Sequence, residues 1–102
     1  MASKNIELIK RLLIQSGAKI HPMTEGVMVC AYQDKGENRE SFVCSWLGSD
    51  LTVSISINGK ANLKKSTKLV KSIFGKYFAI EHLKNCPLDG QQANYFGLQF
   101  LN

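Results

Sequence analysis

The sequence predicts an α+β fold: a single domain with the element order α-β-β-β-α-β-β, an antiparallel sheet and both helices packed on one face of it. Two segments repeat apolar residues at helical spacing, and five short segments are apolar or alternate in polarity as strands do. Turn residues separate these segments at short intervals. The composition, 44% apolar and 21% charged over 102 residues, is typical of one globular domain covering residues 1–102.

The first helix is expected over residues 4–16. Either Ser3 or Asn5 is the expected N-cap, because a short polar side chain accepts hydrogen bonds from the free N–H groups of the first turn. Gly17 is expected to end the helix, since glycine tolerates the left-handed backbone conformation that follows many helices. The apolar positions that recur at helical spacing are Ile6, Leu8, Ile9, Leu12 and Leu13.

Three strands are expected next, over residues 27–33, 41–47 and 51–58, with a hairpin loop over residues 34–38. The third strand alternates without interruption, which predicts one buried and one solvent-facing side. Its apolar side holds Leu51, Val53, Ile55 and Ile57, and its polar side holds Thr52, Ser54, Ser56 and Asn58.

A hairpin loop centred near Glu37 sets the register of the first two strands and collects bulky side chains on one face. The facing pairs predicted in this register are Cys30 with Cys44, Met28 with Trp46, and Tyr32 with Phe42. In an oxidising environment this register allows a disulfide between Cys30 and Cys44. The odd number of cysteines, with Cys86 as the third, instead fits a reducing cytoplasm with buried thiols.

The second helix is expected from Leu63 to Phe74, with Asn62 as its N-cap and Gly75 at its end. Strands over residues 77–83 and 94–101 follow it. This helix is the most amphipathic element of the chain. Its apolar arc contains Leu63, Ser66, Leu69, Val70, Ile73 and Phe74, and lysines occupy the opposite arc.

The net charge of +5 and the pI of about 9.2 suggest an anionic partner. Residues 1–59 hold six basic and six acidic residues, so the whole excess lies in residues 60–102. Six lysines fall between residues 60 and 76 with no acid among them: Lys60, Lys64, Lys65, Lys68, Lys71 and Lys76. An ordinary solvated helix usually mixes both signs, so this face is predicted to bind phosphates or an acidic protein surface.

The start of the second helix adds to this prediction. Lys64 and Lys68 are like charges four residues apart, and Lys64 and Lys65 oppose the helix dipole in the first turn. Free N–H groups there, with Asn62 and Ser66 nearby, are expected to help hold an anion. Tyr77 and Tyr95 are candidate side chains for stacking on exposed bases, although packing in the core is the alternative role for the aromatic residues.

Over residues 5–76 the element order resembles that of double-stranded-RNA-binding domains. Lys64-Lys65-x-x-Lys68 looks like the lysine cluster with which that family grips phosphates across the RNA major groove. The loop over residues 34–38 lacks the family's Gly-Pro-x-His-like signature, and two strands follow the second helix, so the resemblance is one of layout. The layout is similar to that of small toxin ribonucleases too, without their Gly-Ser-His-like catalytic motif.

Neither a catalytic nor a cofactor motif is found. His21 and His82 could serve as the acid and base of a ribonuclease only if the fold brought them together. The cysteine spacing does not indicate a zinc site, and no apolar run reaches the length of a membrane span, so neither metal nor membrane is expected.

The sequence therefore favours a small, non-enzymatic nucleic-acid-binding or regulatory protein of the cytoplasm, with DNA and RNA both open. The alternative is a protein-binding adaptor or inhibitor, of the secretion-chaperone, immunity-protein or phage-inhibitor type, that docks its basic face on an acidic partner. A homodimer formed through an exposed strand edge is compatible with either function.

Overall fold

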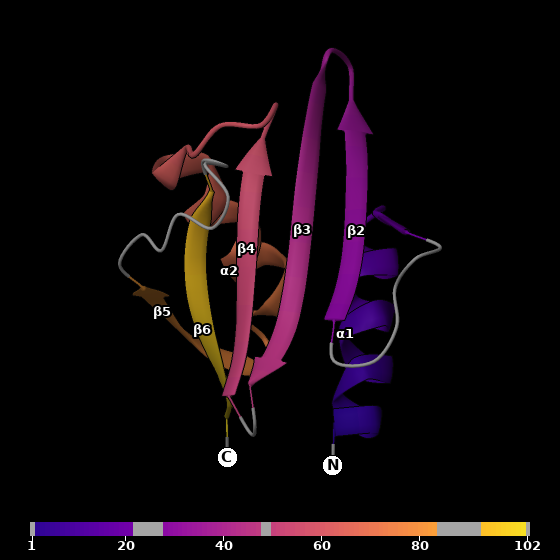
Figure 1. Cartoon of the computed structure of the whole chain (residues 1–102), viewed down its shortest axis with the longest axis vertical. Coiled ribbons are helices and arrows are strands. Elements are labelled where there is room, and N and C mark those ends of the chain that lie inside the picture. The colour runs from indigo at the N-terminus through magenta and orange to yellow at the C-terminus, as the bar shows by residue number, and fades with distance from the viewer. Residues whose placement is uncertain (1, 22–27, 48–49, 84–92, 102) are drawn as a thin grey trace.

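The computed structural model describes residues 2–21, 28–47, 50–83 and 93–101, with the backbone alone at residues 2–5 and at Leu47. Two helices and six strands follow one another in the order α-β-β-β-β-α-β-β (Figure 1). They are α1 (Ala2–Gln15), β1 (Lys19–Ile20), β2 (Met28–Lys35), β3 (Asn38–Leu47), β4 (Asp50–Ile57), α2 (Leu63–Phe74), β5 (Phe78–Leu83) and β6 (Asn94–Phe100). The predicted α+β class is confirmed, with one short strand added to the expected order.

All six strands form a single antiparallel sheet in the spatial order β1-β2-β3-β4-β6-β5. The first four strands are neighbours both in the chain and in the sheet. Helix α2 then carries the chain across to the far edge, where β5 forms the edge strand and β6 returns between β5 and β4. The last strand of the chain thereby lies directly beside β4.

The added strand β1 pairs with Tyr32 and Ala31 of β2. The backbone N–H of His21 extends this ladder by donating to the carbonyl of Cys30 at 2.8 Å. A strand of two residues has no pattern of alternation, so the sequence carries no signal for it.

The β2–β3 hairpin differs from the predicted register by one residue. Its loop is the two-residue turn Gly36-Glu37, and Gly36 has a φ of 61°, which suits the first loop position of such a turn. Cys30 therefore lies opposite Val43 instead of Cys44. Because a shift of one residue exchanges the faces of a strand, the predicted pairs Cys30–Cys44, Met28–Trp46 and Tyr32–Phe42 are wrong.

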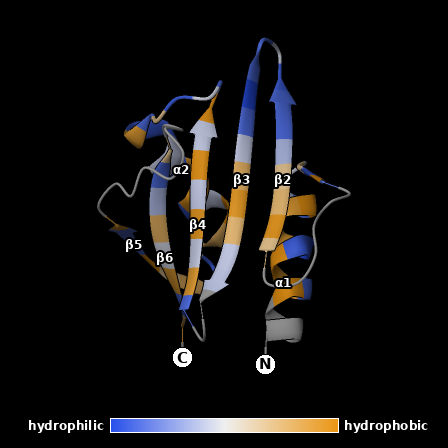
Figure 2. Cartoon of the chain, viewed as in Figure 1, coloured by the Kyte–Doolittle hydropathy of each residue, from blue (hydrophilic) through white to orange (hydrophobic). Residues whose placement is uncertain are grey.

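Both helices lie against the same face of the sheet, as predicted (Figure 1). α1 packs on β1 and β2, and α2 packs on β4, β5 and β6. Every second residue of β4 points into the layer between the sheet and the helices. In Figure 2 these residues are the orange, apolar bands of β4, and the pale bands between them are its more polar residues. The largest fully buried side chains are Phe42, Phe74, Phe78, Phe96, Ile9 and Leu13, which come from both helices and from three strands.

The opposite face of the sheet is covered by neither helix, and we call it the open face. It carries the alternate residues of each strand, among them Cys30, Val43, Ser54, Glu81, Tyr95 and Gly97. After Asp50, the side chains of β4 on this face are the small hydroxyls of Thr52, Ser54 and Ser56. The Ser45 and Thr52 hydroxyl oxygens lie 3.1 Å apart across β3 and β4. The predicted solvent-facing side of this strand is thus confirmed for Thr52, Ser54 and Ser56, whereas Asn58 lies beyond the strand in a turn with a φ of 54°.

Helix α1 begins earlier than predicted. Ser3 and Asn5 lie inside the helix, so neither is its N-cap. The predicted end is confirmed, because Gly17 has a φ of 103° and the next N–H, that of Ala18, donates to the carbonyl of Leu13 at 3.0 Å.

Candidate functional site

Helix α2 has the predicted bounds and caps. The Asn62 side chain accepts a hydrogen bond from the backbone N–H of Lys65 at 3.1 Å, and Gly75 follows the last helical residue. The predicted apolar arc faces the core except at Leu63, whose exposed fraction is 49%. The buried side chains of the helix are Ser66, Val70, Ile73 and Phe74.

The lysines of this helix and its flanks all lie on the exposed side, and we call the set the α2 lysine face. It consists of Lys60, Lys64, Lys65, Lys68, Lys71 and Lys76. The three ion pairs formed among the described residues lie on α1 and on the β2–β3 hairpin, so none of them involves this face. Lys64, Lys68 and Lys71 form a row along the helix, separated by rises of about 6 and 4.5 Å.

Three of the four N–H groups at the start of α2 are already bonded, so less of the helix end is open to an anion than the sequence led us to expect. Asn94 of β6 is buried, and its side-chain oxygen accepts from the backbone N–H groups of Asn62 and Leu63 at 3.1 Å each. The Asn62 side chain in turn accepts the hydrogen bond from the backbone N–H of Lys65. Ser66 is fully buried, so its hydroxyl does not reach the surface. An anion at this face would therefore be bound mainly by the lysine side chains.

The two tyrosines proposed for stacking lie on different sides of the molecule. Tyr77, 44% exposed, follows α2 directly, and its backbone is held by hydrogen bonds with Phe74 and Leu101. Tyr95 lies on the open face, across the sheet from α2. Only Tyr77 is therefore able to share a ligand with the α2 lysine face.

Arginine is the usual reader of guanine and the usual bidentate clamp of phosphate, yet α2 has none. Arg39 is engaged in the β2–β3 hairpin, where its Nε and Nη2 donate to Asp34 at 2.7 and 3.0 Å. Its guanidinium also lies 4.6 Å from the centre of the Tyr32 ring. The hydrogen bonds from Arg39 lower the pKa of the Asp34 carboxyl. The other arginine, Arg11, lies on α1.

The two histidines are not brought together. His21 follows β1 at one edge of the sheet and His82 lies in β5 at the other, five strand spacings apart, or roughly 24 Å. The His82 ring instead packs against Phe96, with ring centres 5.5 Å apart. One copy of the chain thus does not assemble the acid–base pair that a two-histidine ribonuclease needs.

The cysteines give neither a disulfide nor a metal site in the described part of the chain. Cys44 is buried beneath the helices and Cys30 is half-buried on the open face, so the corrected register removes the proposed bridge. Burial raises the pKa of the Cys44 thiol. Cys86 lies outside the described residues. Within those residues, no group of three or more His, Cys, Asp or Glu side chains is placed to hold a metal ion.

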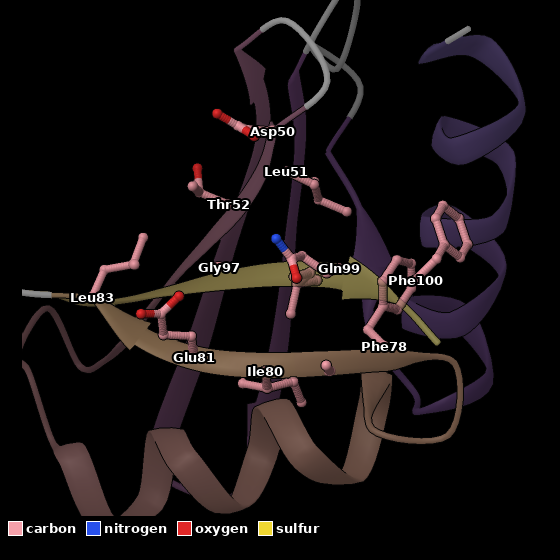
Figure 3. A pocket seen from close by; sticks show the side chains of 12 residues that line it. Asp50, Leu51, Thr52, Phe78, Ile80, Glu81, Leu83, Gly97, Gln99 and Phe100 are labelled. Carbon is pink, nitrogen blue, oxygen red and sulfur yellow. The ribbon is translucent and has the colours of Figure 1, made fainter. Parts of the chain in front are cut away.

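The structure also reveals a feature that sequence reasoning missed: a hollow of about 520 Å³ on the open face, where β4, β5 and β6 meet (Figure 3). Asp50 and Glu81 line it, and Gly97 of β6 lies between Thr52 of β4 and Glu81 of β5. The polar alternation of residues 52–56 indicates the face. It cannot indicate the hollow, because that depends on β6 inserting between β4 and β5.

Comparison with known proteins places the chain in no family: no family model, no curated protein and no solved structure matches it. Among the described residues, neither helix combines the length and the apolar character that crossing a membrane requires. Function is accordingly inferred from the two surfaces described above, the α2 lysine face and the open face.

Proposed function

We propose that the chain is a small, non-enzymatic nucleic-acid-binding or regulatory protein whose α2 lysine face contacts the phosphate backbone. The observation that carries this proposal is the row of exposed lysines without an ion-pair partner among the described residues. Folding gains nothing from the N-terminal part of this row, since Lys64 repels Lys68 and both Lys64 and Lys65 oppose the helix dipole. A polyanion bound along the helix offsets these penalties.

The dimensions of the row fit a phosphate backbone. Lys64, Lys68 and Lys71 span about 10 Å along α2. Successive phosphates of one strand of a duplex are displaced by about 3.4 Å along its axis, so this length corresponds to about three phosphate spacings. Lys60 and Lys76 lie beyond the two ends of the helix and extend the basic surface in both directions.

The same surface suits contact with the backbone better than readout of bases. It has no guanidinium group, the N–H groups of Asn62, Leu63 and Lys65 are already bonded, and Tyr95 lies on the other side of the sheet. Binding is therefore expected to be electrostatic, independent of sequence and strongly dependent on salt. DNA and RNA remain equal candidates.

The test is fluorescence anisotropy with labelled single- and double-stranded DNA and RNA at about 50 and 200 mM salt. We expect binding at low salt, and we expect the Lys64→Glu/Lys68→Glu variant to lose it. Lys68→Glu alone should reduce the log–log salt slope by about one unit. Lys19→Glu is the matched control, because it makes the same change of charge on β1, away from α2, and should leave the slope unaltered.

Failure to bind any of the four nucleic acids at low salt would contradict the proposal. Lysines without arginines also suit an acidic protein surface, which is the second candidate function. That adaptor or inhibitor role is supported if the wild-type chain retains one acidic protein in stoichiometric amount while Lys64→Glu/Lys68→Glu does not.

A further inference from the structure

The hollow on the open face is built by residues of three strands. Asp50 and Thr52 come from the start of β4, Glu81 and Leu83 from β5, and Gln99 from β6. Figure 3 shows these side chains around one space, with Gly97 beneath it. The space measures about 520 Å³, within the range in which proteins hold ligands or partner side chains.

Glycine at position 97 creates this space without being required by the backbone. Its φ is not positive, and a Cβ built there would lie 3.6 Å from the Leu83 Cδ2, an ordinary contact. The ladders on both sides run through this residue without a bulge, pairing it with Thr52 and Glu81. Glycine within a strand weakens a sheet and often marks a place where another chain or a ligand approaches closely.

The charge of the hollow is opposite to that of the chain. Its lining contains Asp50 and Glu81 and no Lys or Arg, whereas the chain as a whole carries +5. Both carboxylates are exposed, and neither takes part in the ion pairs among the described residues. The hollow therefore favours a cationic side chain and disfavours the phosphates expected at α2.

The neighbouring strand edge offers backbone hydrogen bonds. β5 is the last strand in the sheet order, so in the described part of the chain its outer edge pairs with no strand. Its six residues, FAIEHL, contain no Pro, Lys or Arg, and the single charged side chain, that of Glu81, lies on the open face. An extended segment added there would place every second side chain on the open face, over Ala79 and Glu81.

From these observations we propose that the edge of β5 and the hollow together bind an extended, basic segment of a partner protein. A lysine or arginine paired beside Glu81 would contact that carboxylate and extend over Gly97 into the hollow, whose far side carries Asp50. The intervening residues would lie on the side of half-buried Ile80 and be apolar or β-branched. This site is separate from the α2 lysine face and does not depend on the function proposed there. Pairing of two copies through β5 is disfavoured in the register that sets Glu81 opposite Glu81, because like charges directly opposite destabilise a sheet.

The test uses fluorescence anisotropy with the labelled peptide Lys-Thr-Lys-Val-Lys-Thr-Lys-Val. A peptide of the same composition with its four lysines in one block is the control for charge alone. We expect the alternating peptide to bind more tightly than the block peptide, and Glu81→Gln/Asp50→Asn to weaken it about tenfold. Glu37→Gln, which removes one acid in the β2–β3 turn, should leave its Kd unchanged.

A second variant tests the shape of the hollow. Gly97→Val fills the space with a residue that favours strands, so it should fold at least as well as the wild type and still weaken the alternating peptide. Lys64→Glu/Lys68→Glu should not weaken peptide binding, which separates this site from α2. Equal binding of both peptides, or a Kd insensitive to both hollow variants, would overturn the proposal. A dimer in sedimentation that Gly97→Val dissociates would assign the site to a second copy instead.

Discussion

The two faces of the sheet differ in chemistry although they share every strand. On the helix side, β4 contributes four buried apolar side chains, and the outer surface of that layer carries the α2 lysines. On the open face, the same strand contributes half-exposed hydroxyls, and its first residue, Asp50, joins Glu81 at a negatively charged hollow. Strand alternation thus lets one small domain present a basic surface on its helix side and an acidic hollow on its open face.

The buried layer between the helices and the sheet therefore supplies the stability of the fold, whereas the two outer surfaces are available for binding. The core lies entirely between the helices and the sheet, so residues of the open face and the outer side of α2 can change with little cost to folding. Substituting neighbouring residues that point to different sides tests this division.

The largest difference is expected between Phe42 and Val43 of β3. Phe42 is fully buried beneath the helices, whereas Val43 is 36% exposed on the open face. Phe42→Ala should lower the free energy of unfolding by about 3–5 kcal/mol because it leaves a cavity, and Val43→Ala by less than about 1 kcal/mol. Urea denaturation measures both, and equal losses would show that the open face is buried in solution.

The next effect concerns Asn94 and Asn62, which both cap α2. Asn94→Ala should cost about 1–3 kcal/mol, because two backbone N–H groups lose a buried acceptor. Asn62→Ala removes one exposed bond and should cost about 1 kcal/mol. Thermal or urea unfolding gives the comparison. A smaller loss at Asn94 than at Asn62 would indicate that solvent replaces the bonds made by β6.

These two asparagines also show how far the sequence predicts the site. Asn62 is predictable as the N-cap from its place before an amphipathic segment, since local capping follows local sequence. Asn94 is more than thirty residues away, and its role depends on β6 lying beside β4. The α2 lysine face follows from helical periodicity, which is local, so it can be predicted from the sequence. The hydrogen bonds from the N–H groups of Asn62 and Leu63 to Asn94, and the hollow, depend on distant strands and cannot be.

The hairpin register shows a different limit. Residues 28–33 are apolar or weakly polar on both sides, so hydrophobic pattern alone does not separate the two faces of β2. The two-residue turn at Gly36-Glu37 decides the register and places Cys44 in the core. The resulting difference between Cys30 and Cys44 leads to the third prediction.

Stability should fall at alkaline pH because of Cys44. Burial raises the pKa of this thiol in the folded state, whereas in the unfolded chain it ionises near pH 8.5. Above that pH the unfolded state loses a proton that the folded state keeps, so the free energy of unfolding should fall by up to about 1.4 kcal/mol per pH unit. Urea denaturation between about pH 8 and 10 measures the slope. It should be reduced in Cys44→Ala and retained in Cys30→Ala, and an equal slope in both variants would contradict this assignment.

The smallest expected change in stability comes from reversing the charge of Lys64 or Lys71. These two variants separate the effect of a lysine on folding from its effect on binding. Lys64 lies in the first turn of α2 and Lys71 in the last, so the helix dipole opposes the first charge and favours the second. Lys64→Glu should therefore raise the free energy of unfolding by about 0.5–1 kcal/mol, because the new carboxylate suits the dipole and stands four residues before Lys68. Lys71→Glu should lower the free energy of unfolding by a similar amount.

Both variants should weaken nucleic-acid binding, because each removes one positive charge from the row and adds a negative one. Thermal unfolding of the two variants should show that Lys64→Glu gains stability and Lys71→Glu loses it. Fluorescence anisotropy should show that both variants lose affinity for nucleic acid. If Lys64→Glu instead gained stability and kept its affinity, the charge at that position would have no part in binding.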